Sequence, residues 1–273
     1  MSDKPIQSLP ITRRSQIFFI IKEDPSLLFF INLTGALFFV PLAFVATWGI
    51  ISFGALGTKE GVTANEMFLS IFFPALASIP AITIAGIGMC GIYSVISRLV
   101  TRTTSSYSVF WIGIKDNWKQ FVLTHTIIGF LMFFFLTNLA AFYYTDLNAG
   151  LKLFSLIISS ILLVVFLFIK PFILFQCTLF DNNYIIILRN SLGFIGKRFL
   201  YNLLAFLISI IMFVLIGFLP GWFRVVPIVF IGGYWLMFEA LVNYIICINT
   251  LETKYPREIT AEFYRRGLEK EED

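Results

Sequence analysis

The chain has 273 residues, of which 58% are hydrophobic, 18% aromatic and only 13% charged, with a formal net charge of +4. Soluble domains carry roughly 25% charged residues, so this composition, with a mean hydropathy of +0.88, excludes an ordinary soluble domain. Several apolar stretches reach the length of about 20 residues that crosses roughly 30 Å of hydrocarbon. The sequence therefore predicts an all-α, polytopic transmembrane bundle.

Residues 1–26 are polar to amphipathic and predict a cytoplasmic N-terminal segment that ends near Pro25. The first apolar run is longer than the apolar core of a signal peptide, which spans roughly 7–15 residues, so we expect no cleavable signal peptide. The first span is expected at 27–53. Pro41 should kink it, which a bundle tolerates where neighbouring groups satisfy the freed backbone.

The second span, expected at 67–97, contains two prolines and three closely spaced glycines. Glycines at such spacing let a second helix approach closely. The alternative is a break in the helix that lines a cavity, as in some transporters. These residues are Pro74, Pro80, Gly86, Gly88 and Gly91.

Four further spans complete a predicted six-helix transmembrane domain over residues 27–250. The charged residues 251–273 then form a cytoplasmic C-terminal tail. The four spans are expected at 121–144, 153–180, 199–219 and 225–250.

Two basic segments between spans, 108–120 and 181–198, are rich in aromatic or aliphatic residues. This pattern suits helices that lie in the headgroup region of a membrane, so the expected partners are the lipid bilayer and its anionic headgroups. Asp181 and Asn182 are good N-caps for the second helix. Basic residues among aromatic ones also occur in nucleic-acid-binding segments, but the adjoining spans argue against nucleic acid as a partner.

The Lys and Arg residues are distributed unequally between the two sides of the predicted membrane. With six spans, sixteen of them share the side of the N-terminus and three lie on the other, while Lys170 falls inside a span. The positive-inside bias predicts a multi-pass plasma-membrane protein with both termini in the cytoplasm.

A weak internal repeat is also visible, because an amphipathic segment precedes each of three hairpins, at 17–26, 108–120 and 184–198. A genuine repeat would be threefold and parallel. Chance similarity among apolar helices is the alternative.

Two ionisable residues, Lys170 and Glu239, are each the only charge in their span. Such residues are costly in a membrane, by about 2.5–3.5 kcal/mol on insertion scales, and are functional candidates. Counted from the cytoplasmic ends of the predicted spans, both lie about 15 Å inside the membrane. We therefore predict an intramembrane charged pair. Snorkelling of Lys170 to the headgroups and contact with a transported substrate are the alternatives.

Other polar residues in the spans could form a polar site or hold helices together. His125, the only histidine, occurs early in its span, as do Asn32 and Asn202. Six amide side chains in the spans are expected to form hydrogen bonds between helices, each contributing around 0.6 kcal/mol. They are Asn32, Asn138, Gln176, Asn202, Asn243 and Asn249.

No pattern of residues predicts catalysis or a cofactor. The sequence lacks the nucleotide-binding, zinc-protease, serine-hydrolase and CxxC motifs. The three cysteines, all within predicted spans and without paired spacing, are expected to be small buried hydrophobic residues. We expect no enzyme activity, no metal and no cofactor. These cysteines are Cys90, Cys177 and Cys247.

Four stretches resemble the YesL-like family of bacterial integral membrane proteins, whose molecular function is unassigned. The resemblance covers roughly residues 27–250 and implies a plasma-membrane protein whose genes often lie beside those of carbohydrate ABC transporters. The stretches are Phe30-Ile31-Asn32-Leu33, Gly91-Ile92-Tyr93 with Arg98-Leu99, Phe110-Trp111 with Asn117-Trp118-Lys119, and Phe180-Asp181 with Leu188-Arg189-Asn190-Ser191-Leu192.

Two functions follow as hypotheses. The first is a non-catalytic accessory or regulatory protein associated with carbohydrate uptake, with a membrane protein such as a sugar ABC transporter as its partner. The second is a small-molecule transporter or channel with a polar site near Lys170 and Glu239.

Overall fold

The described part of the chain is almost entirely helical. The computed structural model describes Lys22, residues 24–102, 105–179 and 183–197, and a few single positions between 199 and 211. Within these residues there are six helices and no strand. Their bounds are α2 Pro25–Leu37, α3 Val40–Gly57, α4 Ala64–Arg102, α5 Ser108–Tyr144, α6 Ala149–Leu179 and α7 Tyr184–Lys197.

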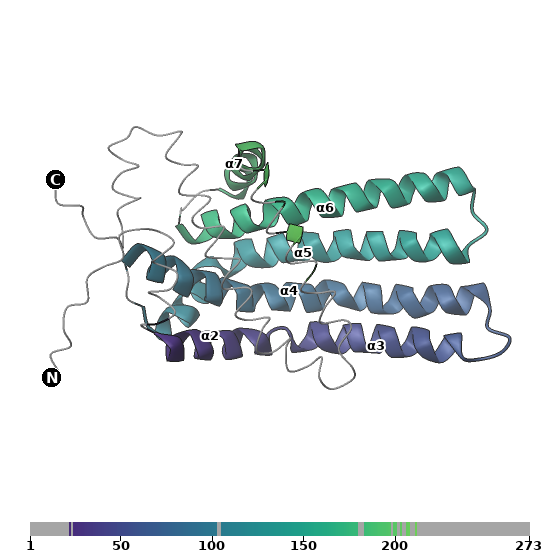
Figure 1. Cartoon of the computed structure of the whole chain (residues 1–273), viewed down its shortest axis with the longest axis horizontal. Coiled ribbons are helices and arrows are strands. Elements are labelled where there is room, and N and C mark those ends of the chain that lie inside the picture. The colour runs from purple at the N-terminus through teal and green to yellow at the C-terminus, as the bar shows by residue number, and fades with distance from the viewer. Residues whose placement is uncertain are drawn as a thin grey trace.

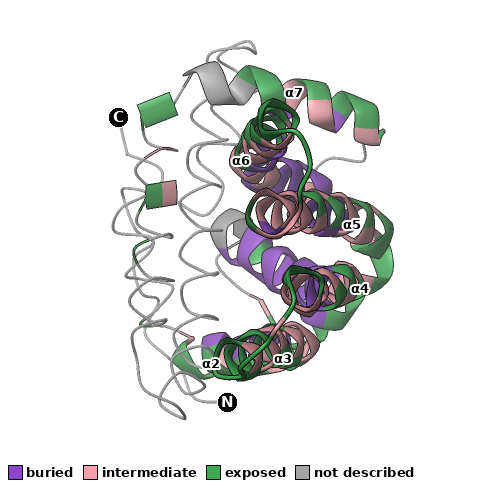
Figure 2. Cartoon of the chain, turned by 90° about the vertical axis from the view of Figure 1, so that its right-hand side faces the viewer, coloured by how far each residue is buried: buried purple, intermediate pink, exposed green. Residues whose placement is uncertain are grey.

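Four of the described helices, α3 to α6, are long and apolar enough to cross a membrane. They run side by side, and the loops α3–α4 and α5–α6 lie at the same end of the bundle, which we call the loop end (Figure 1). At the opposite end, α2 continues the line of α3, and α7 lies across the bundle (Figures 1 and 2). We call this second end the α7 end. The last two predicted spans lie almost wholly outside the described residues.

The first predicted span is divided into two helices near Pro41. The ring of a proline clashes with the carbonyl four residues earlier and offers it no N–H; here that carbonyl belongs to Leu37, where α2 ends. The N–H groups of Phe38 and Phe39 instead donate to carbonyls three residues back, at 3.1 and 2.9 Å. Pro41 itself lies in the first turn of α3, so the predicted kink is confirmed as a break between helices.

The second predicted span forms one helix of 39 residues, α4, which passes through Pro74 and Pro80 without interruption. Its glycines serve close packing. A Cβ added at Gly88 would lie 2.7 Å from the Phe38 Cβ and 2.9 Å from the Gly35 carbonyl oxygen. A Cβ at Gly86 would lie 2.5 Å from the His125 ring. The interfaces of α4 with α2 and α5 therefore leave no space for a methyl group at these points.

The prediction of a separate surface helix at 108–120 is wrong in one respect. These residues are helical, but they form the first turns of α5, which continues to Tyr144 as one helix of 37 residues. No proline interrupts this stretch. The buried Phe110 ring occupies the space left by Gly91, and Gly113 packs directly against Ser94. Contact with α4 thus holds the segment in line with the rest of α5.

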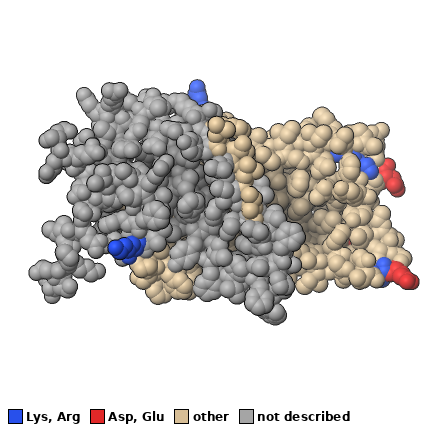
Figure 3. Space-filling view, viewed as in Figure 1, with Lys and Arg blue, Asp and Glu red and all other residues tan. Residues whose placement is uncertain are grey.

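The helix predicted at 181–198 is found as α7, while its place at a membrane surface stays a prediction. Its first turn is capped by Asn183, whose Oδ1 accepts a hydrogen bond from the Ile185 N–H at 3.3 Å. The expected caps, Asp181 and Asn182, lie outside the described residues. Among the described residues on the face shown in Figure 3, charged side chains occur at the loop end and toward the α7 end.

We predict that Gly88→Ala destabilises the bundle, because the new methyl group meets backbone that cannot rotate away. Overpacking typically costs about 1–3 kcal/mol, which thermal unfolding in detergent would detect. Gly54→Ala is the matched control, since nothing lies within 4 Å of its added Cβ. An unchanged melting temperature for Gly88→Ala would contradict the close approach of α2 and α4.

Candidate functional site

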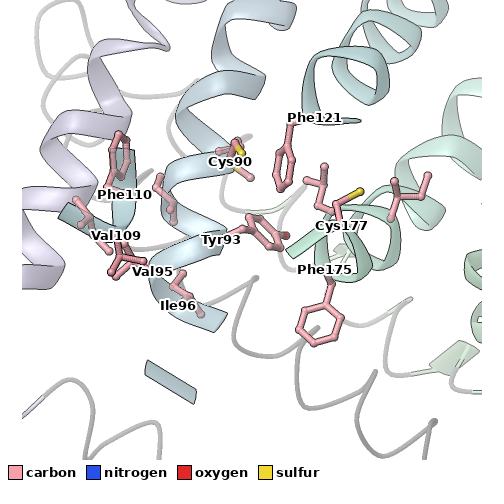
Figure 4. Packing of buried hydrophobic residues seen from close by; sticks show 14 of the residues in the cluster. Cys90, Tyr93, Val95, Ile96, Val109, Phe110, Phe121, Phe175 and Cys177 are labelled. Atoms are coloured by element: carbon pink, nitrogen blue, oxygen red, sulfur yellow. The ribbon is translucent and has the colours of Figure 1, made fainter. Parts of the chain in front are cut away.

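The buried core of the described chain lies toward the α7 end. Large side chains from α2, α4, α5, α6 and α7 form it. In Figure 4, Tyr93 of α4 extends toward Cys177 of α6 with Phe121 of α5 beside it; the Tyr93 and Phe121 rings are 6.0 Å apart. Cys90 and Cys177 are buried and free, which confirms the prediction for these two. Cys247 lies outside the described residues.

His125 is buried at the interface of α5 with α4. Its Nδ1 donates to the Phe121 carbonyl at 2.8 Å, and its ring stacks on the Phe121 ring at a centroid distance of 6.4 Å. Gly86 provides the space that the ring occupies. One ring nitrogen of His125 is therefore already hydrogen-bonded to the backbone of its own helix.

Lys170 is half-buried on α6, and its charge is close enough to act on the His125 ring. The helix continues through Lys170 and Pro171 without a break. No ion pair or hydrogen bond of Lys170 occurs within the described ranges. Glu239 lies outside those ranges, so the charged pair stays a prediction.

Asn32 is buried on α2, with 3% of its surface exposed. Neither its amide nitrogen nor its amide oxygen has a hydrogen-bond partner among the residues that the structure describes, so the bond between helices predicted for Asn32 is not found there. Because Gly88 faces α2 while Gly86 faces His125, and two residues turn a helix by about 200°, α4 separates Asn32 from His125. The structure therefore does not bring these two candidates together. Asn202 lies outside the described residues.

Two sets of polar contacts attach α7 to the bundle. The Gln176 Nε2 lies 2.8 Å from the Ser191 Oγ and within 3.4 Å of the Ile187 carbonyl. Ser191 in turn donates to that carbonyl at 2.8 Å. The hydroxyl oxygens of Thr124 and Tyr184 are 3.0 Å apart and join α7 to α5.

Burial raises the pKa of Tyr184 above its ordinary value, so its hydroxyl stays protonated at neutral pH. The hydroxyl can therefore serve as a donor in the bond to Thr124. The predictions that Gln176 and Asn138 form bonds between helices are confirmed; the Asn138 Nδ2 donates to the Ser155 carbonyl of α6 at 3.4 Å.

Sequence reasoning missed Thr124, Tyr184 and Ser191. Nothing in the sequence distinguishes these three hydroxyl residues from others. Only the crossing of α7 over α5 and α6 brings them to their partners. The spacing of Ile187 and Ser191 on one helical face was the one local signal.

Many of the described polar side chains bond one turn back along their own helix, and a smaller set connects neighbouring helices. No group of three or more His, Cys, Asp or Glu residues that could hold a metal ion occurs in the described chain. Lys170 and His125 offer one cation and one imidazole, which could contact an anionic or polar group.

Comparison with known proteins gives no relative: no family model, no curated protein and no solved structure matches the chain.

We predict that Gln176→Met loosens α7 selectively. The variant keeps the length of the side chain but removes the donor, and removal of a partner from buried polar groups costs about 1–3 kcal/mol. Amide hydrogen exchange over 184–197 should accelerate more than exchange in α4. Thr178→Val is the control, since the Thr178 hydroxyl bonds within its own turn, to the Phe175 carbonyl at 2.9 Å, and to no other helix in the described chain. Equal acceleration in α4 and α7 would contradict this role.

Proposed function

We propose that the chain is a membrane-embedded, non-catalytic accessory protein that acts by contact with another membrane protein. The observation that carries the proposal is that several polar side chains of its helices are used for contacts with neighbouring helices of the same chain. Gln176 and Thr124 hold α7, Asn138 joins α5 to α6, and the hydroxyls of Thr83 and Thr126 meet at 3.0 Å between α4 and α5.

The close contacts of α4 give the second support. A methyl group does not fit at Gly86, Gly88 or Gly91, which leaves no room for a solute to pass between α4 and the helices it faces there. The large exposed side chains of α3 and α6 instead offer a broad lateral surface, as at Phe44, with 72% exposed, and Ile161, with 56% exposed.

The cellular setting of this proposal comes from the sequence. The charge bias places both termini in the cytoplasm, and the resemblance to the YesL-like family suggests the plasma membrane of a bacterium. The partner we propose is a membrane protein of carbohydrate uptake.

The second candidate is a small-molecule transporter or channel. Lys170 and His125 favour it, because they offer a cation and an imidazole at similar distances from the loop end, about 31 and 28 Å, and could bind a polar solute. This candidate needs a path that includes residues outside the described ranges.

Photo-crosslinking in cells tests the accessory function. A photoreactive amino acid at Phe44, Ile161 or Ile185, which are all exposed, should give a discrete covalent product with a carbohydrate-uptake protein from at least one position. The same group at Phe172, which is fully buried, should link only within the chain. Products with lipid alone at every exposed position would contradict the proposal.

Solute uptake into proteoliposomes separates the two candidates. Under the accessory function, uptake of labelled sugars should equal that of empty liposomes. Uptake that Lys170→Met abolishes and Lys152→Met retains would establish the transporter instead. Lys152 is a suitable control because its Nζ donates to the Thr145 carbonyl at 2.9 Å, at the loop end.

A further inference from the structure

The bundle is packed in two different ways along its length. Every residue of the large hydrophobic core lies about 30 Å or more from the loop end, at 1.5 Å per helical residue. Ile169, the core residue of α6 nearest to the loop end, is twenty residues from Ala149. Beyond it, the core contains fully buried large side chains such as Tyr93, Phe110 and Phe175.

Between that level and the loop end, large side chains point outward. Exposed examples are Phe44, Phe134 and Ile161. The buried positions there are mainly small residues, although Ile82, Ile128 and Leu163 are larger and keep 5–8% exposure. The small buried residues include Ala75, Ser78, Ala81, Ala140 and Ser159.

These two kinds of packing are expected in different solvents. In lipid, apolar side chains gain nothing from leaving the solvent, so helices associate through small residues and leave large ones outside. Burial of large aromatic side chains is driven by exclusion of water. The change in packing therefore marks a change from hydrocarbon to a more aqueous surrounding.

Helix α7 lies across the bundle at this same level (Figures 1 and 2). Its partner on α5, Thr124, is twenty residues from Tyr144, which is about 30 Å. Its partner on α6, Gln176, is about 40 Å from Ala149. The hydrocarbon core of a bilayer is about 30 Å thick, so a bilayer that begins at the loop end finishes where α7 crosses.

The exposed face of α7 combines apolar and basic groups. Ile185, Ile186 and Leu192 are 73%, 49% and 52% exposed, and Arg189 is exposed beside them. On α5, the exposed Trp118 and Lys119 lie about 40 Å from the loop end. Aromatic rings and basic side chains of this kind occur together at membrane–water interfaces.

From this placement we propose that α7 lies in the headgroup layer of one leaflet, where Arg189 and Lys119 bind the phosphates of anionic lipids. The core beyond α7 then lies at or outside the headgroups. The proposal rests on the membrane embedding in the proposed function.

The position of Lys170 changes with this boundary. It is twenty-one residues from Ala149, about 31 Å from the loop end, and so lies at the boundary instead of about 15 Å inside it. The depth of Lys170 predicted from the sequence takes residue 180 as the membrane end of the span, whereas in this placement α6 continues past the bilayer. The Lys170 side chain can therefore reach the headgroups without an intramembrane partner.

The depth of spin labels in nanodiscs tests the boundary. Single labels at Ile186 and Leu192, in the full chain with its three cysteines replaced, should lie about 15 Å farther from the bilayer centre than a label at Ile161. Labels at Ile186 and Leu192 that are as deep as Ile161, or fully aqueous, would overturn the proposal. A water-accessible label at Ile161 would instead refute the membrane embedding itself.

The preference of the protein for anionic lipid tests the proposed role of Lys119 and Arg189. Spin-labelled phosphatidylglycerol should associate with the protein more strongly than phosphatidylcholine, and the double variant K119Q/R189Q should lower this preference about twofold or more. Asp116→Asn removes an exposed negative charge on α5 near Lys119 and should raise it. Equal preferences in all three proteins would show that α7 does not bind anionic headgroups.

Discussion

The close approach of α4 to the helices on both of its sides is the contact on which the rest of the bundle depends. Its Gly88 faces the Gly35 backbone and Phe38 of α2, whereas Gly86 and Gly91 face His125 and Phe110 of α5. These positions set the rotation of α4 about its own axis, because each glycine has to face a group that a larger residue would displace. The rotation in turn decides that Asn32 and His125 lie on opposite sides of α4.

The direction of α5 follows from the same contact. Phe110 fits over Gly91, and Gly113 packs on Ser94, so the first turns of α5 are attached to α4 before the apolar span begins. An amphipathic segment with exposed Trp111, Trp118 and Lys119 would otherwise be free to lie along a membrane surface. Helix α7 is a helix of 14 residues in the described chain. Its attachment by Gln176 and Thr124 holds it across the bundle.

The polar groups of the bundle follow one principle. A buried polar group is costly without a partner, and most of those described find one on a neighbouring helix or one turn back along their own. Asn32, Ser105 and Thr137 depart from this pattern within the described residues. They are the positions where a partner from elsewhere, whether lipid, solute or protein, would change the energy of the fold most.

The sequence by itself determined the helices. The lengths of the apolar runs indicated α4, α5 and α6, Pro41 indicated the break before α3, and the turn of polar residues near 181–183 indicated a new helix at α7. These features are local, since hydropathy and a missing backbone donor act within a few residues of the chain. The buried state of Cys90 and Cys177 followed from the same apolar runs.

Only the tertiary structure decided which faces meet. Hydropathy does not encode the rotation of one helix against another, so the sequence did not predict that Ser108–Gln120 continues in line with α5, or that Tyr184 reaches Thr124. Each of these depends on residues from two helices, and their positions are fixed jointly by the small residues that let the backbones approach. Contacts between distant segments arise from that packing, which no single stretch of the chain contains.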